Sequence, residues 1–327
     1  MVTESDNSFG FKMATCPTVL LSSGYQMPVV GLGTFDNLKD DLVCDAVKTA
    51  IDAGYRLIDC AWIYRSEAAV GRGIADRIKA GVVTRKDLFV TTKLWCTFHE
   101  PERVEEGLRE SLKELGLDYV DLFLMHWPLA IKEQKADKKA WILSSALQPA
   151  AVDYIDTWRA MEDLVEKGLT RSIGVSNFNA TQLTRLINAP GLRIKPANMQ
   201  LESHPLLHNQ EIIDLCHAHG ISVTAFSPLA KGGAGKPVEN ILVNPVIAEI
   251  AKKHNRTPAQ VVLRWCLQRG LCIVPKSCTP TRIQENYQIF DFTLSEDDMK
   301  GLSSLNKNKR LVTFETAKDL PEYPFQL

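Results

Sequence analysis

Short apolar runs alternate with amphipathic segments along most of the chain. The apolar runs are rich in Val, Ile, Leu and Phe and lack polar alternation, which is typical of parallel strands covered on both faces. Eight runs are predicted as strands: residues 29–35, 56–61, 88–95, 119–127, 171–178, 197–204, 222–229 and 271–277. Strands that alternate with helices predict a mainly parallel sheet with right-handed crossovers. A count of eight favours closure into a (β/α)8 TIM barrel.

Between these runs, apolar residues recur every three or four positions, which is the spacing of an amphipathic helix. The predicted helices span 39–53, 102–116, 153–167, 180–188, 209–219, 245–254, 258–269 and 281–289. Gly54, Gly168 and Gly220 follow three of these segments. We expect them to end the helices, because glycine readily adopts the left-handed conformation of a helix C-terminus.

An open, doubly wound sheet is the lesser interpretation of the same alternation. Sheets of that kind that bind dinucleotides carry a G-x-G-x-x-G turn between a strand and a helix. Here Gly31 and Gly33 lack the third glycine, and no helix is predicted to start there. Residues 18–28 are predicted to form a hairpin that plugs the bottom of the barrel.

The domain organisation is expected to be simple. We predict a flexible N-terminal extension over residues 1–16 and a single barrel domain over 17–327. Residues 128–152 and 230–244 are longer than ordinary connections, so they are expected to form loops at the active-site face. The second of these connections is rich in glycine and contains no tryptophan.

Composition narrows the class of protein. The net charge of −1 gives no overall field that would attract nucleic acid or an anionic membrane. Eight scattered cysteines without a CxxC pair suggest reduced thiols in a cytosolic compartment. No apolar run approaches membrane-spanning length, and the N-terminus is not signal-like. We therefore expect a cytoplasmic protein that binds neither nucleic acid nor membrane.

Four residues suited to acid–base chemistry fall near the carboxyl ends of successive predicted strands. Asp59 lies at the end of the second strand with Tyr64 just beyond it, Lys93 near the end of the third, and His126 near the end of the fourth. Active sites of (β/α)8 enzymes are built at this face. Taken singly, each has a structural alternative: Asp59 as a helix cap, a role for which Ser66 is better placed, and Tyr64 or His126 as a core side chain. Lys93 is harder to explain in this way, because lysine is rarely buried unless it is paired. Their joint placement indicates a catalytic site.

Three segments carry recognisable motifs: IDCAWIYRSEAAVG (58–71), GLRESLKELGLDYVDLFLMHWP (107–128) and IVPKSCTPTRIQEN (273–286). They resemble signatures of the aldo-keto reductase family, and most of all its aldose and aldehyde reductase branch. The similarity runs over roughly residues 17–327. It implies a (β/α)8 enzyme that reduces aldehydes or ketones with NADPH.

The residue chemistry supports this mechanism independently. No side chain supplies hydride, so a nicotinamide cofactor must do so. Tyr64 is the predicted general acid, because a nearby Lys93 ammonium would lower the pKa of its phenol from about 10. Asp59 would hold Lys93 in an ion pair, and a neutral His126 would donate a hydrogen bond to the carbonyl oxygen.

The resemblance also implies an NADPH site. The expected cofactor-binding residues are Gly33, Thr34, Phe35, Asp59, Ser176, Asn177, Gln200, Phe226, Ser227, Leu229, Lys276, Ser277, Thr279, Arg282, Glu285 and Asn286. Phe226 stands where the branch usually has a tyrosine that stacks on the nicotinamide, and phenylalanine retains that aromatic face. Lys276 and Arg282 form a cationic pair suited to the 2′-phosphate. We therefore expect a strong preference for NADPH.

The predicted substrate pocket is aromatic and apolar, which suits a hydrophobic carbonyl compound. Its expected lining is Phe35, Trp62, Trp95, His126, Trp127, Val312 and Phe314. No metal site is predicted, since His217 and His219 lie on a predicted helix without an HExxH motif.

Two other functions stay open. The first is an NADPH-binding barrel without turnover. The second is a phosphate-binding isomerase or aldolase in which Lys93 forms a Schiff base. The complete set of four catalytic candidates favours the reductase. The expected substrate is a small carbonyl compound, open among sugars, lipid aldehydes, steroids, ecdysteroids and xenobiotic ketones, and we expect a monomer.

Overall fold

The protein is a closed barrel of eight parallel strands. The computed structural model describes residues 16–35, 40–133, 147–230 and 239–325. The strands are β3 (Gly31–Gly33), β4 (Leu57–Asp59), β5 (Phe89–Leu94), β6 (Leu122–Met125), β7 (Ile173–Ser176), β8 (Asn198–Glu202), β9 (Ser222–Phe226) and β10 (Leu271–Ile273). Each pairs with its neighbour in sequence, and the bridges Val30–Ile273 and Gly33–Lys276 join the first strand to the last. The predicted (β/α)8 fold is confirmed, and every strand falls within a predicted apolar run.

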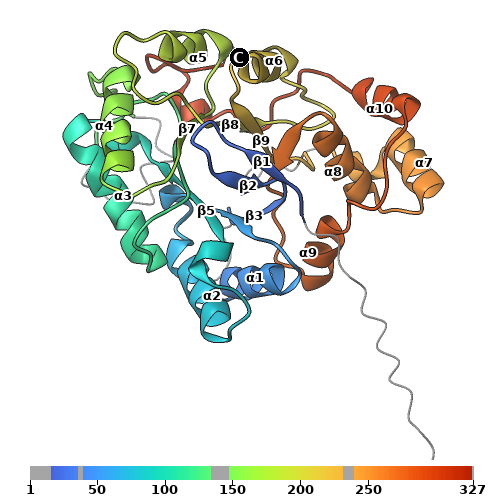
Figure 1. Ribbon diagram of the computed structural model, residues 1–327. Helices are drawn as coiled ribbons and strands as arrows, with labels where there is room; N and C mark the ends of the chain where they lie inside the picture. The colour runs from blue at the N-terminus through green and yellow to red at the C-terminus, as the bar shows by residue number, and fades with distance from the viewer. Residues whose placement is uncertain (1–15, 36–39, 134–146, 231–238, 326–327) are drawn as a thin grey trace, which may run out of the picture.

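Helices surround the barrel (Figure 1). They are α1 (Asp40–Asp52), α2 (Glu67–Lys79), α3 (Pro101–Leu115), α4 (Tyr154–Glu166), α5 (Ala180–Ile187), α6 (Gln210–Ala218), α7 (Pro245–His254), α8 (Pro258–Gln268), α9 (Pro280–Tyr287) and α10 (Glu296–Ser303). All the predicted helices are present, to within two residues at each end. Helices α2 and α10 were not among them, although Ser295 and Asp298 form a capping box at the start of α10.

Local sequence explains where these helices pack and end. In α3, apolar residues such as Val104 and Leu108 are buried against the barrel, at the spacing of one helix face. Gly54, Gly168 and Gly220 have φ values of 104°, 71° and 70°. These angles lie in the left-handed region that glycine adopts without strain, so the predicted helix ends are confirmed.

The N-terminal hairpin closes one end of the barrel. Strands β1 (Thr18–Leu20) and β2 (Gln26–Pro28) pair antiparallel and cross the barrel centre in the view of Figure 1. Leu21 and Met27 of the hairpin pack inside the barrel with Phe89, the first residue of β5. The hairpin is therefore the predicted plug, and it sits at the amino-terminal ends of the strands.

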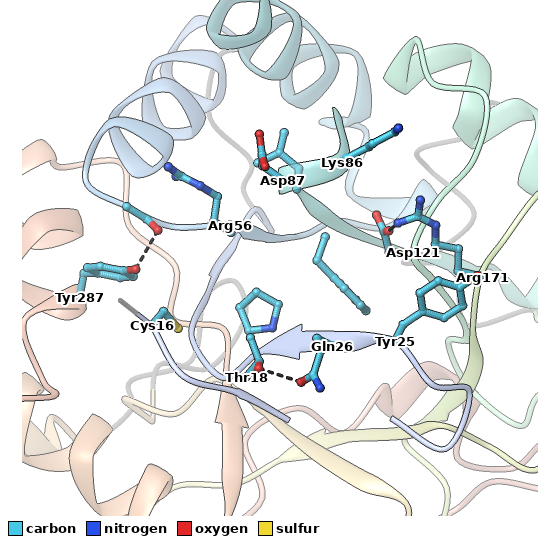
Figure 2. A pocket seen from close by; sticks show the side chains of 14 residues that line it. Cys16, Thr18, Tyr25, Gln26, Arg56, Lys86, Asp87, Asp121, Arg171 and Tyr287 are labelled. Atoms are coloured by element: carbon cyan, nitrogen blue, oxygen red, sulfur yellow. Dashed lines mark hydrogen bonds and ion pairs between the residues drawn. The ribbon is translucent and has the colours of Figure 1, made fainter. Parts of the chain in front are cut away.

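A cavity of about 380 Å³ opens at this plugged end (Figure 2). Several of its polar groups bind one another: Thr18 Oγ1 donates to Gln26 Oε1 at 2.8 Å, and Arg171 lies 2.8 Å from Asp121. None of the four catalytic candidates lines it. The cavity belongs to the packing of the hairpin, and the candidate site lies at the opposite end of the barrel.

Other expectations meet the structure as follows. All eight cysteines lie in described residues and none forms a disulfide, which agrees with reduced thiols. Among the helices of the described segments, none combines the length and apolarity needed to cross a membrane. Of the two long connections, 134–146 and 231–238 lie outside the described residues, as do residues 1–15 of the N-terminal extension.

Candidate active site

A buried ion pair forms the floor of the site. Lys93 Nζ lies 2.7 Å from Asp59 Oδ2 and donates to the carbonyl oxygen of Cys60 at 2.8 Å. Burial alone would lower the pKa of Lys93, but the Asp59 carboxylate, together with Tyr64 and Cys60, outweighs it and leaves that pKa raised, so the lysine stays charged. Gln200 Nε2 donates to the other carboxylate oxygen, Asp59 Oδ1, at 2.8 Å. The two oxygens of Asp59 are thus held from two different strands.

Tyr64 lies directly beside this pair. The short 3-10 helix Trp62–Tyr64 follows β4 and brings the Tyr64 ring centroid to 4.9 Å from Lys93 Nζ. Burial raises the pKa of the Tyr64 phenol, and the Lys93 ammonium opposes that rise without reversing it. The expected net lowering is therefore wrong, because burial outweighs the charge. The phenol is protonated at neutral pH, the form that a proton donor needs.

His126 completes the group. Its ring lies 5.7 Å from the Tyr64 ring, centroid to centroid, at an interplanar angle of 76°. Burial and the charge of Lys93 hold the pKa of His126 well below its usual range. The imidazole is neutral, as expected, and carries one N–H donor. The structure thus brings all four predicted catalytic residues together at the carboxyl ends of β4, β5 and β6.

Three predicted pocket residues form an aromatic wall around His126, namely Trp95, Trp127 and Phe314. Trp95 lies 5.4 Å from His126 between ring centroids. Phe314 lies 5.7 Å from Trp95 and 5.3 Å from Trp127. Val312 is partly exposed two residues before Phe314. The wall is apolar, whereas the floor is charged.

Phe35 and Trp62 lie differently from each other. Phe35 is 48% exposed and meets the Tyr64 ring edge-on at 5.0 Å. Trp62 Nε1 instead donates to Glu110 Oε2 of α3 at 2.7 Å, and its ring meets Phe98. The structure therefore places Phe35 beside Tyr64, while Trp62 contacts Glu110 and Phe98.

The residues expected to hold a nicotinamide ring lie on or directly after three neighbouring strands, β7, β8 and β9. Asn177 follows β7 and donates through Nδ2 to the His126 carbonyl oxygen at 2.9 Å and to Ser176 Oγ at 3.1 Å. Its Oδ1 is buried and has no hydrogen-bond partner among the described residues. Buried polar atoms are normally paired, so this oxygen fits a ligand that presents an N–H donor, such as a carboxamide. Phe226 is the last residue of β9, the strand that pairs with β8, where Gln200 lies.

The residues expected to bind the cofactor phosphate follow β10. Thr279 directly precedes α9, where Lys276 and Arg282 are exposed, and its backbone N–H donates to Ser277 Oγ at 3.1 Å. A helix N-terminus with two cations is electrostatically suited to a phosphate. The Gly33–Lys276 bridge places this segment beside the end of β3, on the same face as the floor.

The remaining predicted cofactor residues are placed as follows. Thr34 Oγ1 donates to the Asp59 carbonyl oxygen at 2.9 Å, so its hydroxyl hydrogen-bonds the backbone at the end of β4. Ser227 has a φ of 48° just after β9, and Leu229 is partly buried. On α9, Asn286 is buried and Glu285 is exposed.

Sequence reasoning missed two buried carboxyl groups near the site, Glu67 and Glu202. Thr92 Oγ1, next to Lys93 in the chain, donates to Glu67 Oε1 at 2.5 Å. Burial raises the pKa of Glu67 to about 7. Glu202 is completely buried at the end of β8. A glutamate within a predicted buried strand was the available signal for Glu202, as it was for Lys93.

No group of three or more His, Cys, Asp or Glu side chains in the described ranges is placed to hold a metal ion. Together, the residues described above give the site a charged floor, a protonated phenol, a neutral imidazole and an aromatic wall.

Comparison with known proteins places these features in context. The profile described as the aldo/keto reductase family matches residues 29–307. Estradiol 17 beta-dehydrogenase 5 of Mus musculus is 44% identical over 316 residues, covering 94% of this chain and 97% of that protein. Prostaglandin-E(2) 9-reductase of Oryctolagus cuniculus is 44% identical over 313 residues, covering 94% and 97%. A crystal structure of a Bombyx mori aldo-keto reductase in complex with NADP superposes with a TM-score of 0.87 at 40% identity, covering 96% of this chain and 100% of that one.

Proposed function

Because the chain belongs to the aldo/keto reductase family, we propose that it reduces aldehydes or ketones to alcohols with Tyr64 as the proton donor. It is an NADPH-dependent oxidoreductase, as its family and its NADP-bound structural neighbour indicate. The observation that carries the finer proposal is the buried Lys93–Asp59 pair beside the protonated Tyr64 phenol.

Each of the four side chains has a separate role in the reaction. NADPH, when bound, supplies the hydride. Tyr64 gives its hydroxyl proton to the carbonyl oxygen, and the Lys93 ammonium stabilises the phenolate that remains. Asp59 keeps Lys93 charged and in place. His126 donates an N–H to the carbonyl oxygen and so orients it for proton transfer. In the reverse direction the Tyr64 phenolate accepts the alcohol proton.

The cofactor would be held at two ends of the same face. Asn177 and Gln200 would hold the carboxamide, which the unpaired Asn177 Oδ1 supports. Lys276 and Arg282 would bind the 2′-phosphate at the start of α9, where their charges favour NADPH over NADH. We also propose that residues 17–327 act as one catalytic domain and that the protein is a cytoplasmic monomer. Size-exclusion chromatography would test the oligomeric state.

The experiment is the Tyr64→Phe variant, followed by NADPH absorbance with a panel of aromatic and aliphatic aldehydes. Turnover should fall by about 10²–10⁴-fold, because general acid catalysis is lost, while the Kd for NADPH stays within about twofold. Tyr25→Phe on the hairpin removes the same hydroxyl far from the site and should leave turnover unchanged. Retained turnover in Tyr64→Phe refutes the role of Tyr64.

The same assay separates the rival functions. A wild-type protein that binds NADPH yet consumes none with any aldehyde would be a non-catalytic barrel. Borohydride trapping of a carbonyl substrate on Lys93 would indicate Schiff-base chemistry. The proposal expects no such adduct, because Lys93 is buried, paired and held charged by Asp59.

A further inference from the structure

Glu202 is a buried carboxylate that hydrogen-bonds a distant stretch of backbone. Its side chain is fully inaccessible at the end of β8. Oε1 accepts the Leu311 N–H at 2.9 Å, and Oε2 accepts the Val312 N–H at 2.9 Å. His204 Nε2 lies 2.8 Å from Oε1. Because a buried carboxylate is unfavourable without such partners, the end of β8 and residues 311–312 are held together.

The two bonded N–H groups lie three and two residues before Phe314, a member of the aromatic wall. Phe314 has a φ of 50°, in the left-handed region that bulky residues rarely adopt. Such a conformation persists only where surrounding contacts determine it. The hydrogen bonds of Glu202 on one side and the rings of Trp95 and Trp127 on the other supply those contacts.

The rest of the 310–325 segment is tied to the barrel as well. Gln182 Nε2 donates to the Glu322 carbonyl oxygen at 2.8 Å, and Asn179 Nδ2 donates to the Pro324 carbonyl oxygen at 3.1 Å. Phe325 meets Trp127 at 5.7 Å between ring centroids. The wall is therefore preformed, and Glu202 is the contact through which a barrel strand holds the part of the segment next to Phe314.

We propose that Glu202 is a positioning residue that sets the substrate selectivity of this reductase, by fixing Phe314 in the aromatic wall opposite His126. The preformed wall favours carbonyl compounds with a flat aromatic body over compact ones, because an ordered wall loses little entropy on binding them. The inference rests on the proposed function, since it concerns which carbonyl compounds reach Tyr64.

The test compares two aldehydes of equal reactive group and unequal bulk, 4-phenylbenzaldehyde and propanal. Glu202→Asp keeps the charge but shortens the side chain by one methylene, so it cannot reach both N–H groups without moving the segment. The ratio of kcat/KM for 4-phenylbenzaldehyde over propanal should fall about tenfold, the scale of one lost apolar contact in a pocket. The fall should come from KM, with the Kd for NADPH unchanged.

A double-mutant cycle shows whether Glu202 acts through Phe314. Phe314→Ala should lower the same ratio, and Glu202→Asp combined with Phe314→Ala should lower it no further. Glu202→Gln keeps the length and one acceptor oxygen, so its ratio should fall less than that of Glu202→Asp. This second variant also carries the test if the aspartate variant fails to fold.

Glu162→Asp is the matched control for a purely structural effect. Glu162 is also completely buried, and its Oε1 accepts the backbone N–H groups of Arg193 and Ile194 at 2.8 and 2.7 Å, away from the site. Its shortening should lower stability and leave the selectivity ratio unchanged.

The outcomes separate the two levels of the proposal. If the wild type reduces neither aldehyde, the proposed function fails. If it reduces both, the role of Glu202 is overturned by an unchanged ratio in both Glu202 variants, by additivity with Phe314→Ala, or by an equal change in Glu162→Asp.

Discussion

Lys93 and Asp59 form an ion pair that is almost entirely buried: Nζ lies 2.7 Å from Oδ2, and the side chains are 0% and 4% exposed. Taking two charges out of water is unfavourable, so each depends on the other. Lys93 Nζ also lies 4.9 Å from the Tyr64 ring centroid. The contact between Lys93 and Asp59 therefore contributes both to the stability of this part of the barrel and to the positive charge next to the proton donor, Tyr64.

Asp59→Asn should lower both the free energy of unfolding and the rate of hydride transfer. The substitution leaves the Lys93 ammonium buried without its counter-charge, which costs about 3–5 kcal/mol in the free energy of unfolding. Single-turnover hydride transfer should slow as well, because Lys93 is no longer held charged beside Tyr64. Urea unfolding and stopped-flow NADPH absorbance measure the two effects.

The matched control is Asp52→Asn. Asp52 pairs with Arg77 at 3.0 Å, with side chains 47% and 24% exposed. Loss of this surface pair should change the free energy of unfolding by about 1 kcal/mol or less. Equal losses for the two variants would contradict the assigned role of burial at Asp59.

Glu67 predicts a specific pH dependence of stability. Burial raises its folded-state pKa to about 7, whereas an unfolded glutamate ionises near pH 4.3. The folded protein therefore keeps a proton that the unfolded chain has lost, and this contribution to stability disappears as pH rises through about 7. Relative to Glu67→Gln, the wild type should lose about 2–3 kcal/mol between about pH 5 and pH 8. Urea unfolding at both pH values checks this, with the exposed Glu102→Gln expected to show no such difference.

Lys276→Ala should narrow the preference for NADPH over NADH. Loss of one charged hydrogen bond to the 2′-phosphate should raise the Kd for NADPH about 10–100-fold and leave that for NADH unchanged. Fluorescence titration with each cofactor measures this directly. Lys86→Ala removes the same charge at the plugged end of the barrel, where both Kd values should stay at the wild-type level. A wild type that binds both cofactors equally would contradict the assignment.

Trp62→Phe should affect stability and not selectivity. The variant loses the hydrogen bond from Trp62 Nε1 to Glu110 on α3, which costs about 1 kcal/mol. Its kcat/KM for 4-phenylbenzaldehyde should stay within about twofold of the wild type, whereas Trp127→Ala in the aromatic wall should lower it about tenfold or more. A large selectivity change in Trp62→Phe would show that this residue lines the pocket.

Periodicity alone predicts most of the fold, because strands buried on both faces leave continuous apolar runs and amphipathic helices separate them. Lys93 stands out in the sequence for the same reason, as a charge inside such a run. Ser66 shows the limit of local patterns. It does precede α2, yet its hydroxyl donates to the Thr34 carbonyl oxygen at 3.3 Å and makes no capping bond.

The features missed by sequence reasoning depend on distance in space. Glu202 binds backbone groups more than a hundred positions away along the chain, and no local pattern encodes that pairing. The pKa of Tyr64 depends on the balance between burial and the distance to Lys93, so residue types alone predicted its direction wrongly. The hydrogen bond from Trp62 to Glu110 likewise joins segments far apart in sequence.

The aromatic wall takes Phe314 from a segment that follows the last strand and helix of the barrel. No strand pairing of the barrel passes through residues 310–325. On the proposed role of Phe314, heritable changes in this segment would alter which carbonyl compounds the enzyme accepts while leaving every barrel strand and the Lys93–Asp59 pair unchanged. Substrate range would then evolve through one short C-terminal segment, separately from the residues proposed to transfer the proton.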